Sequence, residues 1–453
     1  MDTGATTDLD SILNRATTSR FQVVIIALCT AVMIVDGFDT QAISFAAPGI
    51  AAAWHVEHAS FGFVFGIGLF GGLVGAICAG VVADRVGRKP TLLAAVLLFG
   101  AASLATPFVD SMTALSAVRF VTGLGVGGAL PSAIAIAAEY APSRARGTVA
   151  AVTFCGIPLG SVIGSVLAAR LIPSYGWGSV FVAGGVLPLV LLPVLAARVP
   201  ESIRFLATRG DRATIARLLA RMGVADEQAA RLEIAPEAGV RRAPVQSLFT
   251  DGRALGTSLL SVAVFLTLLM AFFLVNWIPT LATRAGIGTS AAILGVGALN
   301  IGGILGGLVI SRFADRWAPG MLISLCYALG AVAVGCVGQA GASGSWLLVS
   351  AFLAGLLAIG AQMCTVSLLA VYYDTRLRAT GVGWTMACGR VGGIIGPVIG
   401  GWLIAGSVSM AAIFLLAGLV CAACAVTVFA LGRLVLRAPV AREATAAGAP
   451  SGS

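Results

Sequence analysis

The chain has 453 residues, of which 58% are hydrophobic and only 10% are charged. Soluble domains carry about 25% charged residues, so this chain has too little charge to cover a water-facing surface. The net charge of +9 does not indicate a nucleic-acid-binding protein, because the basic residues lie singly or in small groups between apolar stretches. The composition therefore predicts a protein embedded in a lipid bilayer.

Apolar stretches long enough to cross a bilayer recur along the whole chain. We predict an all-α membrane protein with twelve transmembrane helices. They lie near residues 21–50, 60–83, 91–109, 112–139, 147–170, 178–197, 254–282, 290–313, 320–339, 345–371, 379–405 and 409–432. The predicted regions are a segment at 1–20, a six-helix half at 21–198, a central loop at 199–253, a second six-helix half at 254–437 and a tail at 438–453. The tail is rich in small residues and is expected to be disordered.

The loops between the spans differ in charge from one side to the other. Only Arg170 and Arg284 lie near the loops of one side. The other side carries Arg85, Arg88, Lys89, Arg144, Arg146, Arg316, Arg376 and Arg378, together with the arginines of the central loop. Because basic loops stay in the cytoplasm, we expect a multi-pass protein of the bacterial inner membrane with both termini cytoplasmic.

The central loop contains one stretch with helical periodicity, Asp211 to Met222. Its apolar residues fall on one helical face and its arginines elsewhere. The two sets are Ile215, Leu218, Leu219 and Met222, and Arg212, Arg217 and Arg221. This pattern predicts an amphipathic helix lying on the inner membrane surface. A mobile charged tether fits the periodicity equally well.

The two halves are internal copies. At one constant offset, Tyr140, Arg144 and Arg146 align with Tyr372, Arg376 and Arg378, and Gly123, Gly128, Gly160 and Gly164 align with Gly355, Gly360, Gly392 and Gly396. Two parallel six-helix repeats indicate a transporter with pseudo-symmetric halves and a binding site between them near the membrane midplane.

Several motifs in the first half identify a family. The run Gly80-Val-Val-Ala-Asp84-Arg85-Val-Gly87-Arg88-Lys89 resembles the signature of the major facilitator superfamily between its second and third spans. Further matches to that superfamily are Arg119-x-x-x-Gly123-x-Gly125, Glu139-Tyr-Ala-Pro142-x-x-x-Arg146-Gly147 and Pro200-Glu201-Ser202-x-Arg204. The resemblance implies the major facilitator fold.

The first span narrows the resemblance. Asp36-Gly37-Phe38-Asp39 is similar to the D-G-x-D signature of the aromatic acid:proton symporters, and Asn276-Trp277-x-Pro279 also fits that family. The resemblance implies proton-coupled import of a small aromatic carboxylate, such as a hydroxybenzoate. The antiporter pattern G-P-x-x-G-G is absent from the fifth span, which reads Gly156-Ile-Pro158-Leu-Gly160-Ser, so efflux by antiport is disfavoured.

Charged residues inside spans are costly and indicate function. Asp36 and Asp39 lie three residues apart on one helical face. Because ionising two neighbouring carboxylates in a low-dielectric environment costs free energy, one of them is expected to hold a proton. Arg119, in the fourth span, reaches the depth of this pair. We assign proton coupling to Asp36, Asp39, Arg119 and Glu139. The alternatives are a polar packing contact for the acids and a permanent structural ion pair for the arginine.

Arg390 lies near the middle of the eleventh span, and no acid of the second half lies at its depth. An unpaired buried guanidinium attracts an anion, and its planar fork matches a carboxylate. We therefore predict that Arg390 binds the substrate carboxylate. The other predicted substrate-binding residues are Phe38, Asn276, Trp277, Tyr372 and Trp384. Each of the aromatic residues is, taken singly, more often a packing residue.

A third set of predicted functional residues lies at the cytoplasmic helix ends, where networks of charged side chains can close and open a gate. The predicted gating residues are Gly80, Asp84, Arg85, Gly87, Arg88, Arg146, Asp315 and Arg378. The alternative for arginines such as Arg316 and Arg376 is a plain topology signal.

The remaining expectations concern partners and competing functions. We expect a monomer without cofactor or metal site, and the sequence shows no nucleophile–base pair of an enzyme. Gly66-x-Gly68-x-x-Gly71 matches a dinucleotide fingerprint but lies inside an apolar span, where small residues every fourth position predict tight helix packing instead. A symporter of a non-aromatic acid or sugar, and a membrane sensor of aromatic acids, remain the alternative functions.

Overall fold

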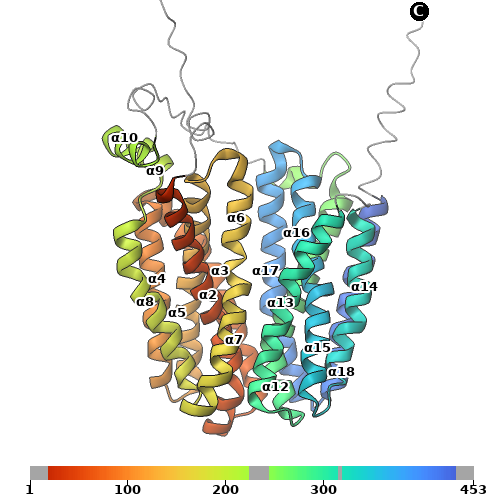
Figure 1. Ribbon diagram of the computed structural model, residues 1–453. Coiled ribbons are helices and arrows are strands. Elements are labelled where there is room, and N and C mark those ends of the chain that lie inside the picture. The colour runs from red at the N-terminus through yellow and green to blue at the C-terminus, as the bar shows by residue number, and fades with distance from the viewer. Residues whose placement is uncertain (1–18, 224–243, 315–318, 435–453) are drawn as a thin grey trace, which may run out of the picture. The chain divides into compact units, whose positions relative to one another are not determined.

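The computed structural model describes residues 19–223, 244–314 and 319–434. The described chain is helical, and twelve of its helical segments are long and apolar enough to cross a membrane (Figure 1). The twelve predicted spans are thus confirmed, with ends that move by a few residues. Contacts divide the chain into two compact units, which are described separately. The first unit comprises residues 1–46 and 67–240, and the second comprises 47–66 and 241–453.

The helices of the first half follow one another through short turns. They are α2 (Arg20–Trp54), α3 (Phe61–Val86), α4 (Arg88–Ala105), α5 (Met112–Glu139), α6 (Arg146–Phe154), α7 (Gly156–Tyr175) and α8 (Gly178–Arg198). Two of these, α6 and α7, together form the fifth span. Short 3-10 turns lie at η1 (His58–Ser60), η2 (Thr106–Phe108) and η3 (Ser143–Ala145).

The second half repeats this arrangement. Its helices are α12 (Ala254–Arg284), α13 (Thr289–Ala314), α14 (Pro319–Val337), α15 (Gly344–Ala354), α16 (Gly360–Tyr372), α17 (Thr375–Ala405) and α18 (Met410–Leu434). A 3-10 turn, η4 (Val245–Leu248), precedes α12. A π-helical turn, η5 (Gly355–Ile359), joins α15 to α16 within the tenth span.

Glycines set the closest helix contacts of the first unit. A Cβ on Gly71 or Gly75 of α3 would collide with the backbone of α5, and one on Gly123 or Gly127 of α5 would collide with the backbone of α3. Small residues thus pack α3 tightly on α5, as predicted, but the predicted stripe of Gly68, Gly72, Ala76 and Gly80 is not in closest contact throughout, since a Cβ on Gly80 would meet nothing within 4 Å. Small residues let two helix backbones approach until their dispersion contacts replace those with lipid.

Glycines also set close helix contacts in the second unit, at the repeated positions. A Cβ on Gly302 would meet the backbone at Phe352, and one on Gly355 would meet the backbone at Leu299. In the same way, a Cβ on Gly392 of α17 would meet the backbone of α12. The internal repeat predicted from the sequence thus repeats the packing as well as the residues.

The central segment forms two short helices, α9 (Ile203–Thr208) and α10 (Arg212–Arg221), at one end of the first unit (Figure 1). The predicted amphipathic helix exists, but its apolar face does not rest on a membrane. Ile215, Leu218, Leu219 and Met222 are all buried in one core cluster with α2, α4, α5 and α8. The expectation of a surface-lying helix is wrong, because the protein itself covers the apolar face.

Candidate functional site

Asp39 is fully buried in the first unit, on α2. The hydroxyl of Ser103, also fully buried, donates a hydrogen bond to Asp39 Oδ1 from α4. The other oxygen, Oδ2, has no hydrogen-bond partner among the described residues. A buried carboxylate with half its hydrogen-bonding capacity unused is costly for a folded protein and indicates a functional group.

Arg119, on α5, faces this carboxylate but does not bind it. Its Nη1 lies 3.9 Å from Asp39 Oδ2, which is longer than a hydrogen bond. Its Nη2 instead donates to the hydroxyl of Thr106 at 2.6 Å. The guanidinium carbon lies 4.9 Å from the centre of the Phe181 ring, a cation–π distance. The arginine is thus held by a hydroxyl and a ring, with the acid close but separate.

Asp36 lies one turn before Asp39 on the same helix and is 2% exposed. The Thr40 hydroxyl lies 3.4 Å from its Oδ1 and donates to it. The predicted grouping of Asp36, Asp39 and Arg119 is therefore present as geometry. Two acids and one base in a buried site leave one negative charge when all three are ionised, so a single proton brings the group to neutrality.

Phe38 lies between the two acids in sequence and is 2% exposed. A Cβ on Gly164 would collide with its ring, and a Cβ on Gly184 would lie 3.3 Å from it. The structure therefore packs Phe38 into the first unit against α7 and α8. In this structure the ring fills the space beside the acids and is not free to contact a ligand.

Arg390 is the central residue of α17, which has 31 residues, and it is half-buried. None of the ion pairs among the described residues involves it. A membrane span needs about 20 residues, so a residue in the middle of this helix lies deep in the bilayer. The second unit thus holds a deep guanidinium to which no carboxylate of the described chain is bound.

Trp277 and Asn276, on α12, use their polar groups within the second unit. The Trp277 indole is fully buried, donates to the Pro397 carbonyl at 2.9 Å, and meets the Phe65 ring edge-to-face at 5.3 Å. Asn276 donates from Nδ2 to the Phe272 carbonyl at 2.7 Å, which leaves its Oδ1 available. Trp277 therefore fixes α17 to α12, while Asn276 keeps one acceptor for another partner.

Tyr372 and Trp384 lie elsewhere in the second unit. The Tyr372 hydroxyl donates to the Arg253 carbonyl at 3.1 Å, and the Trp384 ring meets Phe249 edge-to-face at 5.9 Å. Both contacts are made with the segment just before α12. The structure therefore gives these two residues partners other than Arg390.

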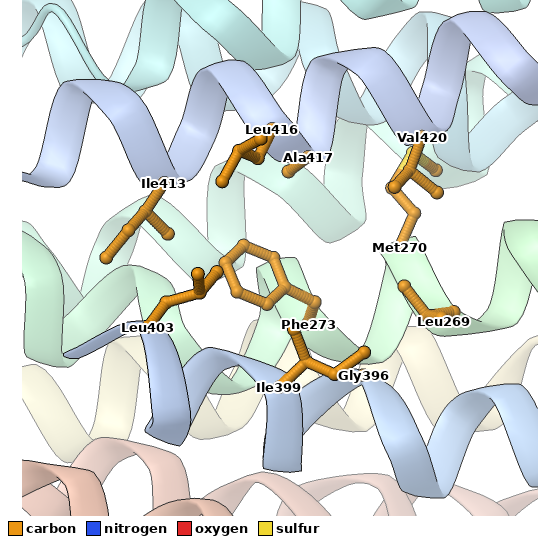
Figure 2. A pocket seen from close by; sticks show the side chains of 10 residues that line it. All are labelled: Leu269, Met270, Phe273, Gly396, Ile399, Leu403, Ile413, Leu416, Ala417 and Val420. Carbon is orange, nitrogen blue, oxygen red and sulfur yellow. The ribbon is translucent and has the colours of Figure 1, made fainter. Parts of the chain in front are cut away.

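A small cavity of about 60 Å³ lies among α12, α17 and α18 of the second unit. Figure 2 shows the side chains around it. Its lining is Leu269, Met270, Phe273, Gly396, Ile399, Leu403, Ile413, Leu416, Ala417 and Val420. Because every lining residue is apolar, this cavity offers no partner for a carboxylate. It is distinct from the arginine site and is a packing gap beside the Gly396–Pro397 segment of α17.

Two of the predicted gating residues, Gly87 and Arg88, lie in a second polar cluster of the first unit. Arg88 makes an ion pair with Glu139, and the Ser202 hydroxyl donates to the other Glu139 oxygen at 2.6 Å. The carboxylate of Glu201 accepts from the backbone N–H of Arg88 at 2.8 Å. It thereby caps the start of α4 beside Gly87, whose φ of 114° favours glycine.

Glu139 does not join the two aspartates, and its contacts are instead with Arg88 and Ser202. It follows Arg119 on α5 by twenty residues, or about 30 Å at 1.5 Å per residue. Its neighbour Tyr140 donates from its hydroxyl to the Glu201 carbonyl at 2.7 Å. Burial, followed by the nearby Glu139 charge, raises the pKa of Tyr140, so this hydroxyl stays a donor.

The other predicted gating residues have looser surroundings. Gly80, Asp84 and Arg85 are exposed, and Arg146 is half-buried. Arg378 is exposed and donates from Nε to the Tyr373 carbonyl at 3.4 Å. Asp315 lies outside the described residues.

Sequence reasoning missed the residues that hold these clusters in place. Ser103 and Thr106 hold the aspartate and the arginine, and Glu201 and Ser202 hold the charge cluster. The available signal for the first pair was two hydroxyls spaced three apart in an apolar span, hence on one helical face.

Comparison with known proteins then identifies the family. The family model described as "Major Facilitator Superfamily" matches residues 29–393 and 260–452. The chain belongs to the Major Facilitator Superfamily. It is accordingly a multi-pass membrane transporter and not an enzyme.

Several curated relatives of this transporter are named after aromatic acids. A "Gallate transporter" of Pseudomonas putida is 36% identical over 432 residues, covering 95% of this chain and 96% of the relative. The "4-hydroxybenzoate transporter PcaK" of Pseudomonas aeruginosa is 38% identical, covering 88% and 89%. The "3-(3-hydroxy-phenyl)propionate transporter" of Escherichia coli is 35% identical, covering 84% and 86%.

A solved structure agrees on the fold. The inward-open xylose transporter XylE from E. coli has a TM-score of 0.69 and 17% sequence identity to this chain, and the match covers 90% of this chain and 96% of XylE. At that identity the likeness shows the major facilitator fold alone. The predicted fold, of twelve helices in two pseudo-symmetric halves, is thus confirmed.

Proposed function

We propose that this transporter imports a small aromatic carboxylate together with protons by alternating access. The observation that carries the proposal is the buried charge. The first unit holds Asp39 and Arg119 at 3.9 Å without a hydrogen bond, and the second unit holds Arg390 without a protein anion. One site can exchange a proton, and the other can take a carboxylate.

The aspartate site suits proton coupling because its charge changes by one between two stable forms. With Asp36 and Asp39 ionised and Arg119 charged, the group carries one net negative charge. Protonation of one carboxylate removes that charge, which lowers the cost of moving the site through a low-dielectric environment. The buried position of both acids supports this role for Asp36, Asp39 and Arg119.

Arg390 suits the substrate carboxylate because a guanidinium binds a carboxylate through two parallel hydrogen bonds. Its half-buried position at the centre of α17 supports binding near the membrane midplane. The free Oδ1 of Asn276 on α12 is a candidate acceptor for a ring hydroxyl. The aromatic nature of the cargo is supported by the relatives named for gallate, 4-hydroxybenzoate and 3-(3-hydroxy-phenyl)propionate.

Alternating access requires contacts that open and close at the membrane surface. The Arg88–Glu139–Ser202 cluster supports a gating role at one end of the first unit. The loop charges support a position of that end, and of both termini, on the cytoplasmic side of an inner membrane. We propose that the transporter acts as a monomer, with each cycle carrying one substrate anion and at least one proton.

The test is uptake of labelled aromatic acids into cells that express the protein, with and without a protonophore. We expect uptake of at least one hydroxylated benzoate to collapse with the protonophore. Arg390→Ala is expected to abolish uptake at all pH values, and Arg390→Lys to weaken it, since an ammonium cannot form the bidentate contact. A folded, membrane-inserted protein that takes up none of the acids would refute the cargo, and protonophore-resistant accumulation would refute the coupling.

A further inference from the structure

Two hydroxyls of the third span, Ser103 on α4 and Thr106 at the start of η2, contact the aspartate and the arginine of the first unit. We propose that Ser103 and Thr106 are positioning residues that keep Asp39 and Arg119 apart and allow Asp39 to gain and lose a proton without any movement of the backbone. This inference rests on the proposed function, in which Asp39 carries the coupling proton.

Ser103 can satisfy both protonation states of Asp39. Its Oγ is within hydrogen-bond distance of Asp39 Oδ1 and lies 3.3 Å from the Phe181 carbonyl oxygen on α8. A serine hydroxyl has one proton to donate and lone pairs to accept. When Asp39 is charged, the hydroxyl donates to the carboxylate. When Asp39 is protonated, the carboxylic acid donates to Oγ, and the serine proton turns to the carbonyl.

Thr106 holds the guanidinium. Its Oγ1 accepts from Arg119 Nη2 at 2.6 Å while donating to the Ala102 carbonyl at 3.1 Å. The second donor nitrogen then rests 3.9 Å from Asp39 Oδ2, where a direct charge-assisted bond would need about 2.8 Å. Both the Asp39 oxygen and Arg119 Nε lack partners within the described chain. The gap is therefore fixed by the hydroxyl and not by the pair itself.

The gap matters because a tight buried ion pair resists protonation. Neutralising one partner of such a pair leaves the other charge uncompensated. Thr106 and the Phe181 ring already support the arginine, so protonation of Asp39 costs less. The charged groups that face Asp39 are Asp36 on its own helix and Arg119 on α5. Among the described residues, α4 and η2 contribute one hydroxyl each and α8 a carbonyl.

The space around Asp39 and Ser103 is restricted. A Cβ on Gly184 of α8 would lie 3.1 Å from both Asp39 Oδ1 and Ser103 Oγ. The hydroxyl and the carboxylate can therefore reverse the hydrogen bond between them, while position 184 has no room for a side chain.

The experiment measures the pH profile of uptake in proteoliposomes, with an imposed pH gradient held constant, for Ser103→Ala and Thr106→Val. Removing the serine donor leaves charged Asp39 less stabilised, so we expect the alkaline limb to move to higher pH by about one unit, the size of one hydrogen bond to a charged group. Removing the threonine acceptor lets Arg119 close on Asp39, so we expect that limb to move to lower pH.

The conservative variants Ser103→Thr and Thr106→Ser retain the hydroxyls and should retain the wild-type profile. Ser103→Cys introduces a weaker donor of similar size, so its alkaline limb should shift less than that of Ser103→Ala. This variant replaces Ser103→Ala in the experiment if the alanine variant does not fold. Opposite shifts support the proposal. Unshifted profiles with only a lower maximal rate, or shifts in the same direction, overturn it. If wild-type uptake itself shows no dependence on the proton gradient, the proposed function fails instead, and the two failures are distinguishable.

Discussion

The two halves of this transporter share their packing and differ in their charge. Gly123 and Gly355 occupy repeated positions, and a Cβ on either would strike a neighbouring helix backbone. Four residues before them, however, Arg119 in α5 aligns with Ala351 in α15. Likewise Arg390 of α17 aligns with Pro158 of α7, and α12, the counterpart of α2, contains no acidic residue. The shared residues build the fold, and the unshared ones carry the chemistry.

This difference is the basis of the proposed division of tasks between the halves. In that proposal, the acid–base group of the first half binds and releases a proton, because each charge has a nearby partner or a hydroxyl. The arginine of the second half, which makes no ion pair with the residues that the structure describes, binds an anion. Each of the following experiments asks whether that division holds.

The largest effect is expected at the unpaired arginine. Arg390→Ala should weaken binding of the aromatic acid by about 30-fold or more, since the contact with a buried carboxylate is worth about 2–5 kcal/mol. Binding of labelled substrate to purified protein measures this. Arg433→Gln, at the exposed end of α18, is the matched control and should bind normally. Equal affinity in both variants would remove Arg390 from the substrate site.

The second effect separates coupling from binding. Asp39→Asn mimics the protonated acid, so we expect it to lose accumulation driven by a pH gradient while retaining exchange of internal for external substrate. Asp36→Asn should retain part of the accumulation, since Asp36 faces no arginine within the described structure. Paired measurements of gradient-driven uptake and exchange decide this. Loss of both activities in Asp39→Asn would assign that aspartate to folding or substrate binding.

The third effect tests the shared packing. Gly123→Ala and Gly355→Ala should each destabilise the protein by about 1–3 kcal/mol, because the added methyl forces two backbones apart. Thermal unfolding in detergent should show similar losses for both. Gly335→Ala, where a Cβ would meet nothing within 4 Å, should leave stability unchanged or raise it. A large loss in only one half would show that the halves do not share their packing energetics.

The smallest effect concerns a pair of repeated tyrosines. Tyr140 donates to the Glu201 carbonyl from a fully buried position, whereas Tyr372 donates to the Arg253 carbonyl from a half-buried one. Tyr140→Phe should therefore cost about 1 kcal/mol, and Tyr372→Phe less, since water can satisfy the exposed carbonyl. Thermal unfolding of the two variants ranks them. The reverse order would contradict the burial argument.

Much of this architecture could be predicted from the sequence because membrane burial leaves strong patterns. Twelve apolar spans and the repeated glycines predict the fold. Charged residues inside spans, such as Asp39 and Arg390, can be recognised as functional candidates because burying a charge in a membrane costs free energy. The hydroxyls of Ser103 and Thr106 cannot be recognised in this way, because a serine or threonine in a helix can donate its hydroxyl hydrogen bond to a backbone carbonyl of the same helix.

Local sequence does not reveal the surroundings of three predicted elements. Glu139 makes an ion pair with Arg88, far along α5 from Arg119. The periodicity of α10 predicts an apolar face but not what covers it, and the expectation of a surface-lying helix was wrong because the protein buries Leu219. The indole N–H of Trp277 donates to the carbonyl of Pro397, a partner 120 residues away.

The most direct test of proton-coupled import is to record internal pH in proteoliposomes while an aromatic acid is added outside, with protein-free liposomes as the blank for passive diffusion. The account predicts protein-dependent acidification of the interior together with substrate uptake, and loss of that acidification in Asp39→Asn. Protein-dependent substrate entry without protein-dependent acidification would contradict it.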